Sequence, residues 1–179
     1  MSALAAARER RSWSKVTDSA PTHDELLPLV AAAARVADHS NLKPWRLIEV
    51  RGADRERLGR ALAKAEGERG VYGKVLRAPL LIAVVASPRK SLKVPEWEQD
   101  ATASGVAHVL SLLLDEAGWG VFWRTGSHTR AKVVGKAHGL GKREKLLGWL
   151  YVGGKPERRR EASRRPVDAE RFLSRMPRV

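Results

Sequence analysis

The chain has 179 residues, a hydrophobic fraction of 43% and no cysteine. This composition fits one globular domain and excludes disulfides, thiolate metal sites and a cysteine nucleophile. The formal net charge is +14 at pH 7, with a cluster of arginines after Gly154, which indicates either a polyanion-binding protein or a solvated basic tail. No apolar run approaches the ~18 residues of a membrane span, and the first twelve residues lack a signal-peptide core, so we expect a cytoplasmic protein.

A short Ala-rich helix is predicted over residues 2–11, followed by Ser12. Arg10 and Arg11 stand beside this hydroxyl, and two guanidinium groups with a hydroxyl match the oxygens of a phosphate. Basic residues are also common at the ends of helices, where they favour the helix dipole. The triplet alone therefore favours the second interpretation.

The next helix begins with a capping box and is predicted over residues 26–37. Thr22 and Glu25 stand at the spacing at which each side chain bonds the other residue's backbone N–H. Arg35 and His39 are at i and i+4, so on a continuing helix both would point the same way. His39 alone is more simply a loop or capping histidine.

The middle of the chain predicts two strands with a helix between them. Residues 46–50 read as a strand and residues 54–66 as an amphipathic surface helix. Residues 79–87 form a continuous apolar, β-branched run, which is typical of a strand covered on both faces.

Residues 94–126 organise the domain as a long helix, a glycine turn and a short strand. The helix is apolar nearly all round, so we expect it to be buried on most sides, and Gly118 stands where a C-cap glycine belongs. One polar line remains, which we interpret as structural: Ser104, His108, Ser111 and Asp115. A short helix over 130–138 and a strand over 149–152 follow, so a three-layer α/β or α+β domain is predicted.

Several catalytic motifs are absent from the sequence. It contains no P-loop, no GxGxxG after the first strand, no GxSxG and no HExxH. The five histidines show no metal-ligand spacing, and no carboxylate pair is placed for glycosidase-like chemistry. We expect no metal site and no dedicated catalytic side chain.

Four segments together resemble the nitroreductase family of FMN-dependent oxidoreductases, in its short single-domain branch. They are RRS at 10–12, HSNLKPW at 39–45, VPEWEQ at 94–99, and AGWGVFWRTG at 117–126 followed by LLGWLYVGGKP at 146–156. The resemblance implies an α+β fold, in which helices flank a central, mainly antiparallel sheet, and an intertwined homodimer. The long apolar helix would lie at the dimer interface. It also implies an FMN-binding domain over 1–156 and a basic C-terminal extension over 157–179.

The same resemblance implies a cofactor site that both subunits share. Arg10, Arg11 and Ser12 would contact the FMN phosphate and ribityl chain. The other implied contacts are Arg35 and His39 from the partner subunit, Trp123, Arg124 and Thr125 along the isoalloxazine, and Arg159 or Arg160 at the phosphate. The implied reaction is ping-pong: NADH or NADPH reduces the flavin and leaves, and a small-molecule acceptor such as a nitroaromatic or quinone is then reduced.

Some positions depart from the family pattern, which leaves the acceptor and the pocket geometry open. Lys43 replaces the usual glutamine before Pro-Trp, and Val36-Ala37 replaces a common Ala-Pro. Two other functions stay open on the sequence alone. One is a basic nucleic-acid-binding module, which the charge and the aromatic residues suggest, and the other is a flavin-binding protein without turnover.

Overall fold

The computed structural model describes residues 2–157 and 166–177. Its strands are β1 (Trp45–Arg51), β2 (Leu80–Ala86), β3 (Trp119–Arg124) and β4 (Lys145–Gly154). The α-helices are α1 (Ala3–Glu9), α2 (His23–Ala33), α3 (Gly52–Ala65), α4 (Glu96–Glu116) and α5 (Lys132–Ala137). Short 3-10 helices lie at η1 (His39–Asn41), η2 (Gly73–Arg77), η3 (Ser127–Arg130) and η4 (Ala169–Arg171).

The four strands form one antiparallel sheet in the order β1-β2-β4-β3. Every residue of β2 is buried, as its continuous apolar sequence predicts for a central strand. The pairing of β2 with β4 shifts register between Val84 and Val85, where Leu147 is the extra residue between Gly148 and Leu146. Such a bulge bends the strand locally, and this one lies beside the site described below.

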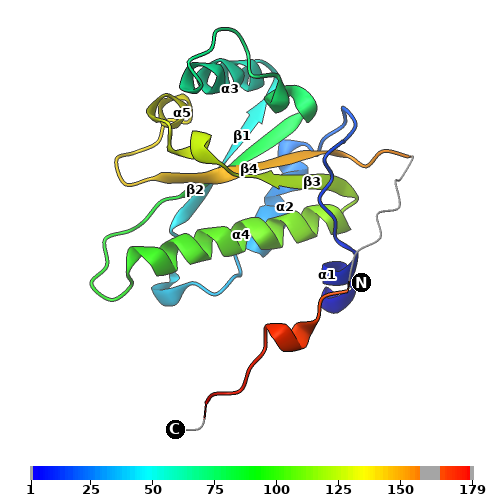
Figure 1. Ribbon diagram of the computed structural model, residues 1–179, viewed down its shortest axis with the longest axis vertical. Helices are drawn as coiled ribbons and strands as arrows, with labels where there is room; N and C mark the ends of the chain where they lie inside the picture. Colours follow the sequence, from blue (N-terminus) through cyan, green and yellow to red (C-terminus); the bar gives the residue numbers. More distant parts are fainter. Residues whose placement is uncertain (1, 158–165, 178–179) are drawn as a thin grey trace.

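Helices cover both faces of the sheet, which confirms the predicted α+β three-layer fold. Figure 1 shows α3 and α5 on one side of the sheet and α2 and α4 on the other. Each side has its own apolar core. Leu58, Leu62, Val75, Leu81 and Trp149 belong to the first core, and Leu26, Ile82, Val106, Leu110 and Leu114 to the second.

Helix α4 is the longest element and runs across the sheet (Figure 1). Its buried side chains face the sheet and α2, but Ala101 and His108 are exposed and Trp97 is 70% exposed. The predicted burial on most sides is therefore not reached within one chain. The helix ends as expected, because Gly118 follows with φ +92°, a conformation that glycine adopts without strain.

The end of α2 differs from the prediction. The capping box of Thr22 and Glu25 is confirmed, but the helix ends at Ala33. Arg35 lies in the turn that follows and His39 in η1, so the two are not on one helical face. The apolar pattern continues past Ala33 because Val36 packs against α4. The Val36 side chain lies 3.8 Å from the position that a Cβ atom on Gly105 would occupy.

Two smaller corrections concern the last third of the domain. The helix predicted over 130–138 is divided into η3 and α5. The strand predicted over 149–152 is longer and spans Lys145–Gly154. Within residues 2–157 and 166–177, no helix combines the length and the apolarity needed to cross a membrane.

Candidate functional site

The segment after α1 lies across β3, which is an edge strand of the sheet. Trp13 donates its backbone N–H to the Val121 carbonyl at 2.9 Å, and Thr17 forms an isolated bridge with Gly154. A Cβ on Gly120 would lie 2.9 Å from Val16 and 3.2 Å from Trp13, which is closer than side chains tolerate. Gly120 is therefore needed for the close approach of the N-terminal segment to β3.

A cluster at the far end of α4 holds this segment in place. The Trp13 indole N–H donates to Asp115 at 3.1 Å. Lys155 bonds the Asp115 carbonyl at 2.7 Å and pairs with its carboxylate at 3.1 Å. Lys155 also lies over the Trp13 ring at 5.6 Å. The end of β4, the end of α4 and the N-terminal segment are thus tied together.

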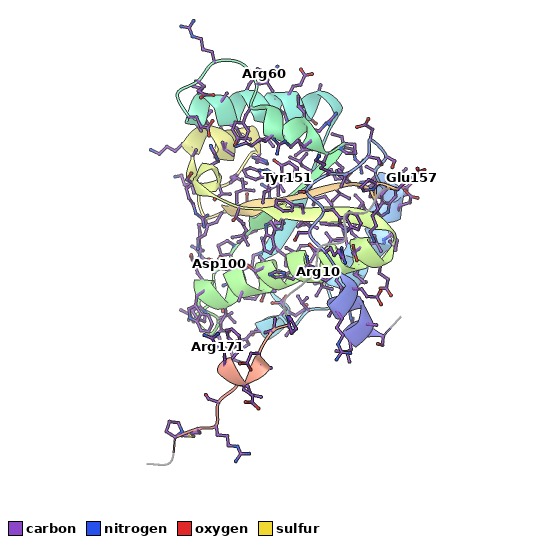
Figure 2. All side chains as sticks on the ribbon, turned by 45° about the vertical axis from the view of Figure 1, so that its right-hand side comes forward. Arg10, Arg60, Asp100, Tyr151, Glu157 and Arg171 are labelled. Carbon is purple, nitrogen blue, oxygen red and sulfur yellow. The ribbon has the colours of Figure 1, made fainter. Side chains whose placement is uncertain are left out.

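A cavity of about 190 Å³ opens between this segment, α4 and β3. We call it the arginine cavity, and its lining residues are Arg10, Arg11, Ser12, His108, Ser111, Val121 and Trp123. Arg10 donates to the Ser12 hydroxyl at 3.2 Å. In Figure 2, Arg10 is seen beside α4. Among the residues that the structure describes, two guanidinium groups and no carboxylate line the cavity, so it suits an anionic group.

Trp123 forms the aromatic wall of the arginine cavity. His108 meets its ring edge to face, with centroids 4.8 Å apart. The buried indole N–H of Trp123 has no hydrogen-bond partner in the described part of the chain. The ring fits beside β4 because Gly148 has no side chain: a Cβ there would lie 2.7 Å from the Trp123 nitrogen. Buried polar groups are nearly always hydrogen-bonded in folded proteins, so this unpaired donor is an unusual feature of the ring.

Arg124 and Thr125 follow Trp123 in sequence but do not line the arginine cavity. The Arg124 guanidinium lies over the rings of Phe122 at 5.2 Å and Tyr151 at 5.4 Å, which belong to the core on the α3 and α5 side. Burial raises the pKa of Tyr151 to about 12, so its ring stays neutral beneath this cation. Thr125 is exposed.

A second hollow lies between η1 and the first half of α4. We call it the His39 groove; its volume is about 400 Å³, and its lining residues are Val36, Ala37, His39, Trp97, Glu98, Ala101, Thr102 and Gly105. The His39 Nδ1 atom lies 2.9 Å from a Glu98 carboxylate oxygen. Because a carboxylate can only accept, Nδ1 carries the proton and donates it to Glu98.

The loop that carries His39 has an unusual backbone. Ser40, Asn41 and Lys43 have φ values of +64°, +51° and +47°, a region that disfavours residues other than glycine. The Asp38 carboxylate holds this conformation by accepting the backbone N–H groups of Leu42 and Lys43 at 3.2 and 2.7 Å. Strained backbone of this kind is concentrated at functional sites.

Apart from Arg124 and Thr125, the described site residues that the sequence predicts therefore lie at two separate hollows of the chain. Arg10, Arg11, Ser12 and Trp123 line the arginine cavity. His39 lines the His39 groove, and Arg35 is exposed nearby. This groove lies against the first half of α4, whereas the arginine cavity lies against the second half. Arg159 and Arg160 lie outside the described residues.

The structure adds lining residues that the sequence did not assign to a site. Among them, His108 and Ser111 line the arginine cavity, and Trp97 and Glu98 line the His39 groove. In the sequence, the only signal for the first pair is a polar line in an otherwise apolar helix, a pattern that by itself indicates a structural role. Glu98 resembled a first-turn acid at a helix start.

Comparisons with known proteins give a consistent result. The family model described as "Nitroreductase family" matches residues 7–154. YdjA of Escherichia coli (strain K12), provisionally named an NAD(P)H nitroreductase, is 34% identical over 161 residues, which cover 86% of this chain and 88% of YdjA. A similarly named protein of Haemophilus influenzae (strain ATCC 51907 / DSM 11121 / KW20 / Rd) is 28% identical over 97% of this chain and 99% of its own length.

Solved structures share the fold at lower identity. A nitroreductase-like family protein from Bacillus cereus superposes with a TM-score of 0.83 and 22% identity, over 98% of this chain and 96% of that one. A mutant of NfnB, described as an FMN and NADPH-dependent nitroreductase from Sphigopyxis sp. strain HMH, superposes with a TM-score of 0.76 and 20% identity, over 97% and 98% of the two chains. With the family model spanning most of the domain, the chain belongs to the nitroreductase family.

Proposed function

We propose that the protein is an FMN-dependent oxidoreductase that uses NADH or NADPH to reduce nitroaromatics, quinones or similar small acceptors by a ping-pong mechanism. The observation that carries this proposal is the arginine cavity, where Arg10, Arg11 and Ser12 stand beside the Trp123 ring. Such a cavity suits a ligand that joins a phosphate to an aromatic ring system. Among its relatives, NfnB is described as FMN and NADPH-dependent, and YdjA is provisionally named an NAD(P)H nitroreductase.

The lining of the arginine cavity fits FMN in charge and in shape. A phosphate dianion would be held by the forked guanidinium groups of Arg10 and Arg11, with the Ser12 hydroxyl beside them. Trp123 would lie along the flavin. Once bound, FMN supplies the hydride-transfer chemistry, and the protein supplies binding, orientation and electrostatics. This division agrees with the absence of a catalytic acid–base pair in the sequence.

One chain does not enclose a whole flavin. At about 190 Å³ the cavity is smaller than the ~300 Å³ or more of a typical ligand pocket. The uncovered face of α4 supports a homodimer that completes it. Trp97, Ala101 and Gly105 form an exposed to half-buried stretch of small and aromatic residues on this face, where a second copy can pack closely.

A two-fold axis through α4 would bring the two hollows together. The arginine cavity lies on the second half of α4, at His108 and Ser111, and the His39 groove lies on the first half. In an isologous, antiparallel pairing of two α4 helices, the second half of one faces the first half of the other. His39 and Arg35 of the partner subunit would then reach the flavin held by Arg10 and Arg11.

The C-terminal part of the chain supports the same assembly. Val167, Phe172, Leu173 and Met176 are all at least 77% exposed, and Figure 1 shows this segment extending away from the sheet and its helices. We propose the domain as residues 1–156 and the basic extension as 157–179, with the extension resting on a second copy. We also propose a cytoplasmic location, where NADH and NADPH are available as reductants.

Steady-state kinetics test the proposed reaction. The purified protein, supplied with FMN, should oxidise NADH or NADPH over many turnovers when a nitroaromatic or quinone is present. Double-reciprocal plots at several acceptor concentrations should be parallel, because the two substrates use the site in turn. Bound FMN with less than one turnover would instead establish a flavin-binding protein without activity, and intersecting lines would overturn the ping-pong order.

A further inference from the structure

The polar line on α4 is formed by Ser104, His108, Ser111 and Asp115, and these residues differ in their hydrogen-bond partners. Ser104 donates to the Asp100 carbonyl at 3.0 Å, and Ser111 donates to the Ala107 carbonyl at 2.8 Å. Asp115 is held by Trp13 and Lys155, as described above. These three residues have the internal hydrogen bonds of a structural role.

His108 has no such partner among the residues that the structure describes. Its ring packs edge to face against Trp123, and neither ring nitrogen makes a hydrogen bond to any residue in 2–157 or 166–177. The side chain is exposed on the surface of α4 and lines the arginine cavity together with Arg10 and Arg11. Its imidazole N–H is therefore available to a ligand in that cavity.

We infer that His108 is a third phosphate-binding residue of the flavin site, donating a hydrogen bond to the phosphate that Arg10 and Arg11 hold. This inference rests on the proposed function, because FMN is the ligand that brings the phosphate there. The charge around the cavity supports this role. Its lining, within residues 2–157 and 166–177, has no carboxylate, and the nearest acid along α4, Asp115, is already paired with Lys155.

The position of Ser111 adds to this arrangement. Its hydroxyl hydrogen is used by the Ala107 carbonyl, so toward the cavity Ser111 can only accept. An acceptor suits a hydroxyl of the ribityl chain and not a phosphate oxygen. His108, one helical turn before Ser111, is thus the donor that α4 offers to the phosphate.

The test compares FMN with riboflavin, which lacks the phosphate. Dissociation constants are measured by flavin fluorescence on the flavin-free full-length protein, its His108→Ala and His108→Gln variants, and the control Ser104→Ala. His108→Ala should weaken FMN binding at least about tenfold, as expected for losing a hydrogen bond to a charged group, and leave riboflavin binding unchanged. His108→Gln, whose amide can still donate, should recover part of the loss, and Ser104→Ala should bind both as the wild type does.

Other outcomes overturn the inference. An equal loss for FMN and riboflavin would assign His108 to the ring or to the support of Trp123, and no loss for either would remove it from the site. If the wild type binds riboflavin too weakly to measure, the visible spectrum of FMN bound to His108→Ala decides: an unchanged spectrum supports a phosphate contact, and a shifted one refutes it. A wild-type protein that binds no flavin would refute the proposed function itself.

Discussion

Arg10 and Arg11 carry the charge of the candidate site, and their removal tests it most simply. Replacing both by alanine should weaken FMN binding at least about hundredfold, because two charge-assisted hydrogen bonds are lost from the phosphate. Neither residue is part of the two apolar cores, so the variant should stay folded. The measurement is the flavin content per subunit after gel filtration, with circular dichroism as the control for folding. Full FMN occupancy in the double variant would refute the phosphate assignment.

Glu98 determines which nitrogen of His39 carries a proton, and a double-mutant cycle measures whether this matters. Glu98→Ala and His39→Ala should each weaken FMN binding about two- to tenfold, and the double variant should bind no worse than His39→Ala. Glu98→Gln should bind as the wild type, because the amide oxygen still accepts from Nδ1. Glu96→Ala is the matched control, since Glu96 pairs with Arg143 instead. Additive losses would show that the two residues act independently.

At the level of residues, the sequence predicted part of the candidate site. Arg10, Arg11, Ser12 and Trp123 line one cavity, and their contacts with FMN stay a prediction. His108 and Glu98 were not predicted as site residues, because a helical residue reaches a cavity only through the rotation of the helix, which packing decides. The contact of Arg124 with the flavin stays a prediction. Within one chain its side chain lies over Phe122 and Tyr151, since alternate residues of a strand face opposite sides of the sheet.

Helix α4 has one face that the single chain leaves uncovered, and a charge placed there should break the proposed dimer. Ala101→Arg would bury a guanidinium group opposite its own copy, which we expect to cost about 3 kcal/mol and to raise the dimer dissociation constant about hundredfold. Ala53→Arg, on the exposed start of α3, is the matched control and should remain dimeric. Sedimentation velocity distinguishes the two states. An Ala101→Arg variant that sediments like the wild type would place the interface elsewhere.

The elements were predicted more accurately than their ends. Continuous apolar sequence identified β2 as a strand covered on both faces, and the capping box located the start of α2. The predicted end of α2 was wrong because the apolar side chain of Val36 packs against α4 and does not belong to a further turn of α2. The extension of β4 to Lys145 was missed because its first residues pair with β2 through a bulge, and a bulge breaks the alternation that marks a strand.

At the scale of the whole molecule, two titrating groups predict how stability depends on pH. The hydrogen bonds and charge of Arg46 hold the pKa of Glu144 at about 2, and burial lowers the pKa of His138, whose Nε2 accepts from the Trp149 indole at 3.0 Å. Both groups bind a proton more readily in the unfolded chain than in the folded one. The stability they provide is therefore present at neutral pH and is lost as the pH falls.

The two contributions should separate in pH. Below about pH 6.5, His138 takes up a proton in the unfolded chain while it stays neutral in the folded protein. Below about pH 4.5, Glu144 takes up a proton in the unfolded chain while it stays ionised in the folded protein. The free energy of unfolding, measured with urea between pH 8 and pH 3.5, should fall in both windows. His138→Gln should remove the first decrease. Glu144→Gln should reduce the second, to which Glu49 also contributes, because its pKa is lowered as well. A wild-type curve that is flat from pH 8 to pH 5 would contradict the role given to His138.

The net charge of +14 has to be reconciled with the family assignment. The family match spans residues 7–154, so the basic protein is a nitroreductase-type domain, and its charge belongs to the surface and tail of that domain. On this account the two hollows on α4, one with paired arginines and one with His39, are halves of a single cofactor site. We propose that the second copy of the chain completes each half.

The most direct test of this account is the visible absorption spectrum of the purified protein, with FMN added if it is colourless. The account predicts the bands of oxidised flavin, one FMN per subunit after desalting, and bleaching when NADH or NADPH is added without oxygen. A protein that stays colourless and does not retain FMN would contradict the assignment of the arginine cavity and with it the proposed function.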